Sequence, residues 1–139
     1  MENNISHTEL IHASLEEVWK HLLFKIDHPE KFIPNVSEVE ILEKTDESTL
    51  RKMKINMSGN EVTILEKITA APYWVRFEII EHPLLMGFVE NHAEAIDAQT
   101  TQLTYTMNWQ HKSSNTPAGN LEVLKSAVLK SKMFIEGNL

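Results

Sequence analysis

The sequence contains no cysteine and only four glycines among its 139 residues. Without cysteine, the chain has no disulfide framework, no thiolate metal site and no cysteine nucleophile. The few scattered glycines form neither a phosphate-cradling loop nor a dinucleotide fingerprint, and the Gly-x-Ser-x-Gly elbow is also missing. These absences argue against nucleotide binding and against nucleophilic catalysis.

Basic residues are outnumbered, with 13 lysines and arginines against 20 acids and a formal net charge of −7. A net negative charge disfavours contact with nucleic-acid phosphates and with anionic membrane surfaces. The first residues lack the basic start and apolar run of a signal peptide, and no apolar segment is long enough to span a bilayer. We therefore expect a cytoplasmic protein with no nucleic-acid partner and no membrane span.

Metal-binding patterns are also missing from the seven histidines. No His-Glu-x-x-His pair occurs, and His28 and His82 each precede a proline in an expected loop. We expect no metal and no cofactor.

An apolar content of 42% is enough for an ordinary core, and the length predicts a single domain over residues 1–139.

A helix is predicted between Ser14 and Pro29, because Ser14-Leu15-Glu16-Glu17 has the form of a capping box. The helical spacing places one set of side chains on an apolar stripe, namely Leu15, Val18, Trp19, Leu22, Leu23 and Ile26. The solvent side is expected to carry Glu16, Glu17, Lys20, Lys25 and Asp27. A short helical turn is expected between Pro29 and Pro34.

The pattern changes to a period of two from about Val36 to His111, with turns expected near residues 46–48, 58–60 and 70–72. The clearest alternation is Leu103, Tyr105, Met107 and Trp109, which predicts a central, half-buried strand. A closing helix is expected to begin between 117 and 121, capped by threonine before Pro117 or by a later residue around Gly119-Asn120, and to end near Gly137. The order of elements predicts an α+β fold.

Four stretches of sequence resemble a known family. They are VWKHLLFKIDHPEKFIPNVSEVEIL from Val18, LRKMKI from Leu50, GFVENHAEA from Gly87 and LTYTMNW from Leu103. Together with the order of elements, they are similar to the START-like, birch-pollen-allergen-like (SRPBCC) superfamily, and more narrowly to its AtaL-like branch. The resemblance implies a helix-grip fold, in which a curved antiparallel sheet of about seven strands wraps around a long C-terminal helix, with two short helices after the first strand. It also implies an internal apolar cavity.

Two charged residues fall on strand faces that are otherwise apolar. Glu66 shares a face with Ile64 and Ile68, so it is either a cavity acid or a carboxylate that reaches water or pairs with Arg51 or Lys67. Arg51 is in phase with Met53 and Ile55. It either points inward toward an anionic ligand, or its aliphatic stem covers the core while its guanidinium group stays in water.

The strand that follows Gly87 has two candidate inner faces. In one register Asn91 and Ala93 face inward, and the amide of Asn91 supplies a donor and an acceptor. A change of one residue near Gln99 would instead turn His92 and Glu94 inward. The two registers predict different sites.

Tyr105 needs a hydrogen-bond partner if it is buried, and Glu66, Asn91 or a ligand could supply one. A proton-transferring pair of Glu66 and Tyr105 is the candidate catalytic arrangement. The full set expected to line the ligand-binding cavity is Arg51, Met53, Ile64, Glu66, Phe77, Asn91, Tyr105, Met107, Leu124 and Val128.

Three functions fit these observations. The first is a small cytoplasmic binding protein that holds an apolar or aromatic metabolite, lipid-like or polyketide-like, in an internal cavity. The second is an enzyme of the polyketide cyclase or dehydratase type that uses a cavity acid. The third is an interaction protein similar to the co-chaperone members of the fold. A homodimer is left open by the sequence.

Overall fold

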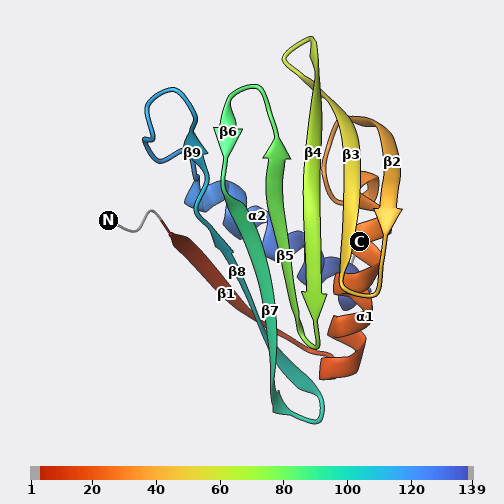
Figure 1. The fold of residues 1–139 in the computed structure, drawn as a ribbon. Coiled ribbons are helices and arrows are strands. Elements are labelled where there is room, and N and C mark those ends of the chain that lie inside the picture. Colours follow the sequence, from red (N-terminus) through yellow and green to blue (C-terminus); the bar gives the residue numbers. More distant parts are fainter. Residues whose placement is uncertain (1–3, 138–139) are drawn as a thin grey trace.

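The computed structural model describes residues 4–137, which form a seven-stranded antiparallel sheet, a two-stranded ribbon and two α-helices (Figure 1). In chain order the elements are β1 (Ile5–Ile11), α1 (Leu15–Asp27), the short 3-10 helix η1 (Pro29–Lys31), β2 (Val36–Lys44), β3 (Ser48–Met57), β4 (Asn60–Ala71), β5 (Trp74–Glu81), β6 (Leu85–Met86), β7 (Phe88–Asp97), β8 (Thr100–Met107), β9 (Gln110–His111) and α2 (Leu121–Ile135). Neither helix in this part of the chain is long and apolar enough to cross a membrane.

Helix α1 begins as the capping box predicts, since the hydroxyl of Ser14 accepts a hydrogen bond from the backbone N–H of Glu17 at 3.2 Å. The apolar stripe is buried at Val18, Leu22 and Ile26. The prediction was wrong at Leu23, which is 39% exposed, because the helix buries a narrower face than the sequence stripe.

The main sheet has the strand order β1-β8-β7-β5-β4-β3-β2, and every neighbouring pair is antiparallel. The pairing register shifts within β2–β3, β4–β5 and β7–β8, and such bulges bend and twist strands. Strands β6 and β9 form the separate ribbon. The curved sheet, the long closing helix and the short helices after β1 confirm the predicted helix-grip fold.

Helix α2 crosses one face of the sheet (Figure 1) and contacts β1, β8 and α1. Its buried residues are Leu124, Val128 and Ser131. The helix starts at the later of the two expected positions, because the Oδ1 atom of Asn120 accepts from the N–H of Val123 at 3.2 Å. The helix therefore does not start at Pro117.

Replacing the capping residue of α2 tests this assignment. Asn120→Ala is expected to lower the free energy of unfolding by about 1 kcal/mol, because an N–H of the first turn loses its acceptor. Thr116→Ala is the control, since within residues 4–137 the Thr116 hydroxyl bonds only to the Ser114 hydroxyl, in the loop before the helix. This variant should stay within about 0.5 kcal/mol of the wild type. Equal losses in urea unfolding would contradict the assignment.

Cross-strand pairing aligns the residues that face α1 and α2. One row runs from Asn91 on β7 to Tyr105 on β8 and His7 on β1. A neighbouring row runs through Phe77 and Val89 to Met107. Side chains in such rows lie close together across the strands, so residues far apart in sequence meet on the concave face.

Candidate functional site

The amine of Lys25, a half-buried residue, lies at the centre of the candidate site. The Nζ atom of Lys25, in the last turn of α1, donates to the Oδ1 atom of Asn91 at 2.8 Å and to the hydroxyl of Tyr105 at 2.5 Å. The same nitrogen lies 4.3 Å from the centroid of the Tyr105 ring and 5.7 Å from that of Phe77. The expectation that Lys25 faces solvent was therefore wrong. Its position, seven residues after Val18 and three after Leu22, places it in phase with the buried stripe.

The surroundings of this amine disfavour its charged form. Burial, and secondarily the positive charge of Arg51, lowers the pKa of Lys25 to about 7. Among residues 4–137, no carboxylate forms an ion pair with Lys25. A buried amine without a counter-ion is costly to keep charged, so near neutral pH the protonated and free-base forms coexist.

Tyr105 links the amine to α2. Its hydroxyl lies 2.6 Å from the hydroxyl of Ser131, and Tyr105 itself is 2% exposed. Burial raises the pKa of Tyr105, and the hydrogen bond with Ser131 only partly offsets this effect. The phenol therefore stays protonated at neutral pH. A continuous polar contact thus joins α1, β8 and α2 through the interior.

Asn91 has a buried donor that no described residue satisfies. Its side chain is 1% exposed, and while Oδ1 accepts from Lys25, the Nδ2 group has no hydrogen-bond partner within residues 4–137. Leaving such a donor unpaired costs free energy of the order of 1–3 kcal/mol. An oxygen supplied from outside the protein would remove this cost.

Arg51 and Glu66 form an ion pair beside this cluster. One guanidinium nitrogen of Arg51 donates to the Oε1 atom of Glu66 at 2.6 Å, and another donates to the carbonyl oxygens of Ile26 at 2.9 Å and Lys25 at 3.2 Å. These carbonyls belong to the C-terminal end of α1, where a cation is electrostatically favoured. Arg51 therefore joins β3, β4 and the end of α1. Of the alternatives for Glu66, the pair with Arg51 is observed.

The predicted pair of Glu66 and Tyr105 is not formed by the described residues, because Glu66 bonds to Arg51 while Tyr105 bonds to Lys25 and Ser131.

The strand β7 has the register in which Asn91 and Ala93 face inward. Asn91 is paired with Tyr105 and is buried, whereas His92 is exposed.

The other residues expected to line a cavity lie in the interior of the protein. Met53, Phe77, Met107, Leu124 and Val128 are buried, and Ile64 is half-buried. The sheet contributes four of them and α2 contributes Leu124 and Val128. Ala95, which follows Asn91 and Ala93 in the same alternation, is exposed near the end of β7.

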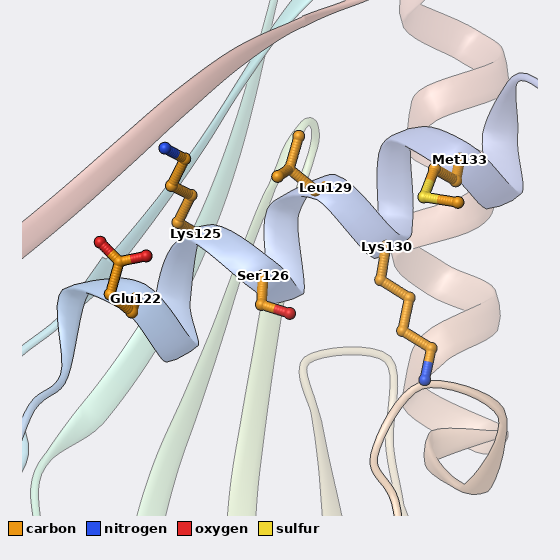
Figure 2. A pocket seen from close by; sticks show the side chains of 6 residues that line it. All are labelled: Glu122, Lys125, Ser126, Leu129, Lys130 and Met133. Carbon is orange, nitrogen blue, oxygen red and sulfur yellow. The ribbon is translucent and has the colours of Figure 1, made fainter.

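Two hollows lie on the surface of the described residues. The first, of about 480 Å³, follows the side of α2 that carries Glu122, Lys125, Ser126, Leu129, Lys130 and Met133 (Figure 2). The second, of about 260 Å³, is bordered by Glu43, Ser48, Leu50 and Lys67. Neither hollow is lined by a residue of the predicted cavity, so the internal cavity stays a prediction.

Sequence reasoning missed a buried histidine next to the site. His21 is 6% exposed, and its ring lies 5.0 Å from the Phe32 ring and 5.4 Å from the Phe134 ring, measured between centroids. Burial, and secondarily the charge of Lys25, lowers the pKa of His21 to about 3. The signal that could have found both residues is their spacing, since His21 lies three residues after Val18 and four before Lys25.

The polar cluster of Lys25, Asn91, Tyr105 and Ser131 thus lies inside a helix-grip fold. The family model described as acetylaranotin biosynthesis cluster protein L (AtaL) matches residues 6–133, and the chain belongs to this family. No curated protein matches the chain.

Several solved structures share the fold. The aromatase/cyclase ZhuI from Streptomyces sp. R1128 is 18% identical with a TM-score of 0.70, covering 99% of this chain and 88% of that one. A START superfamily protein from Mycobacterium smegmatis is 12% identical with a TM-score of 0.71, covering 98% and 99%. Major latex-like protein 151 from Panax ginseng is 16% identical with a TM-score of 0.69, covering 94% and 95%. At these identities the likeness concerns the fold.

Proposed function

We propose that the protein binds an apolar or aromatic metabolite between the sheet and α2, and that the polar cluster of Lys25, Asn91, Tyr105 and Ser131 orients an oxygen of that ligand. The observation that carries the proposal is the amine of Lys25, whose partners within residues 4–137 are neutral, next to the Nδ2 group of Asn91, which has no partner among the same residues. Small-molecule sites are ordinarily apolar enclosures with a few convergent polar groups and residues of perturbed pKa.

The apolar part of the ligand would contact the residues that surround this cluster. Phe77, Met53, Met107, Leu124 and Val128 supply buried apolar surface on both sides of the interior. In this proposal Arg51 and Glu66 hold the end of α1 in place and keep Lys25 positioned, because Arg51 binds the backbone carbonyl of Lys25 itself. A cytoplasmic location stays a prediction of the sequence, which leaves a homodimer open.

The direct test is native mass spectrometry of protein purified from its own host, which should show a co-purifying small molecule. Tyr105→Phe is expected to weaken the affinity for that molecule about tenfold, since loss of the hydroxyl frees Lys25 from its position and a tenfold change corresponds to about 1.4 kcal/mol. Tyr73→Phe is the matched control, because the Tyr73 hydroxyl donates to Glu16 at the surface. Equal affinities for the two variants would contradict the proposed site.

A second candidate function is a cyclase or dehydratase, and the pairing of an amine of pKa about 7 with the protonated hydroxyl of Tyr105 favours it. A base whose pKa lies near the working pH is suited to proton transfer. Proton transfer is assigned here to Lys25 and Tyr105 in place of Glu66, because Glu66 is engaged with Arg51. The aromatase/cyclase among the similar structures is consistent with this candidate. A product that depends on Lys25 would distinguish the enzyme from the binder.

A further inference from the structure

We propose that Lys25 is a nucleophilic amine that captures an aldehyde or ketone ligand as an imine. This inference rests on the proposed function, since the carbonyl compound must first bind between the sheet and α2. It extends that function by naming the chemical class of the ligand and the atom that reacts. The argument depends on what surrounds the Nζ atom.

The contacts of Lys25 leave its amine able to act as a base and a nucleophile. Its hydrogen-bond partners are an amide oxygen and a phenol, both neutral, and no described carboxylate fixes the ammonium form. The guanidinium of Arg51, which is itself paired with Glu66, opposes a positive charge on Lys25. With a pKa of about 7, roughly half of the molecules carry the free amine at pH 7. An ordinary surface lysine, whose pKa is about 10.4, is almost entirely protonated there.

The amide of Asn91 offers a place for the carbonyl oxygen. Its Oδ1 atom contacts Lys25, and its Nδ2 group, attached to the same carbon, is a buried donor without a partner in the part of the chain that the structure describes. A ligand carbonyl that accepts from Nδ2 would therefore have its carbon next to Nζ. This arrangement satisfies the amide and positions the electrophile at the same time.

The reaction needs no oxidant, reductant or further reactant. The lone pair of Nζ forms a bond to the carbonyl carbon while the C=O π bond breaks, and the oxygen takes a proton from the hydroxyl of Tyr105. The nitrogen, now positively charged, returns a proton to Tyr105 and leaves a neutral carbinolamine. The hydroxyl group then takes a proton from Tyr105 and departs as water while the nitrogen lone pair forms the C=N bond, and the resulting iminium returns its N–H proton to Tyr105. The products are one imine and one water, and the hydroxyl of Ser131 keeps Tyr105 in place throughout.

Reductive trapping tests the inference on the intact protein. Cinnamaldehyde with sodium cyanoborohydride at pH 7, followed by peptide mapping, is expected to label Lys25 at least about tenfold faster than Lys20, an exposed lysine on the same helix. The rate at Lys25 should reach half of its maximum near pH 7, a measurement that needs no variant. Lys25→Arg should remove this label and leave labelling at Lys20 unchanged. Labelling of Lys25 no faster than Lys20 would overturn the proposal.

Cinnamyl alcohol separates this inference from the proposed function, because it has the same apolar body and no carbonyl carbon. Binding of the alcohol, measured by calorimetry, without labelling of Lys25 by the aldehyde would refute imine formation and leave the binding role standing. Absence of binding by both compounds would count against the interior site as well. Binding of both together with selective labelling of Lys25 is the expected result.

Discussion

Glu66→Gln is expected to lower the free energy of unfolding by about 3–5 kcal/mol, because it leaves the guanidinium of Arg51 buried without its counter-ion. The two side chains are 2% and 11% exposed, and they meet at 2.6 Å. The loss should also loosen the end of α1, whose carbonyls Arg51 binds. Urea unfolding followed by circular dichroism measures the change.

Asp27→Asn provides the control for this experiment, since it makes the same chemical change in an exposed ion pair. Asp27 pairs with Lys44 at 3.0 Å, and both side chains are about half exposed. Surface pairs of this kind contribute no more than about 1 kcal/mol. Similar losses for Glu66→Gln and Asp27→Asn would mean that the pair of Arg51 and Glu66 is not the structural contact described here.

The second large effect concerns pH. Relative to Lys25→Met, the wild-type protein is expected to gain about 3 kcal/mol of unfolding free energy between about pH 7 and pH 9.5. The pKa of Lys25 is about 7 in the folded protein and 10.5 in the unfolded chain. Across this window the unfolded chain binds the additional proton, so stability rises as the pH rises and falls as the pH is lowered. Below pH 7 the whole cost of the buried charge is present.

Lys20→Met is the matched control for the pH experiment, because Lys20 is exposed on the same helix. It should keep the pH dependence of the wild type, since an exposed lysine is solvated in the folded and in the unfolded states. Denaturant unfolding at several pH values gives the comparison. Parallel stability curves for the wild type and Lys25→Met would show that the amine of Lys25 is solvated in the folded protein.

The fold could be predicted from the sequence because its local signals agree with each other. The capping box at Ser14, the alternation from Leu103 to Met107 and the order of elements all led to the observed architecture. The register of β7 was left open, since both of its faces carry polar residues. Pairing of Asn91 with Tyr105 decides it, and that pairing depends on contacts distant in sequence.

The centre of the site was not predicted, because a lysine on an amphipathic helix is ordinarily a solvent-side residue. Lys25 lies at the edge of the buried stripe, where a small rotation of α1 decides whether its amine meets water or Asn91. Ser131 was missed for a similar reason, as a small polar residue on α2 gives no signal until its partner Tyr105 is known. The sequence left several partners open for Glu66. The pair with Arg51 follows only from the positions of the two residues, which face each other on β3 and β4.

An NMR titration of the lysine Cε signals tests the central claim most directly, because it reports the protonation of the Lys25 amine in the folded protein. The account predicts one lysine signal, assigned by its loss in Lys25→Met, that titrates with a midpoint of about 7 and whose titration changes when a ligand fills the interior. A midpoint for Lys25 near 10.4, the ordinary value for a solvated lysine, would contradict the account.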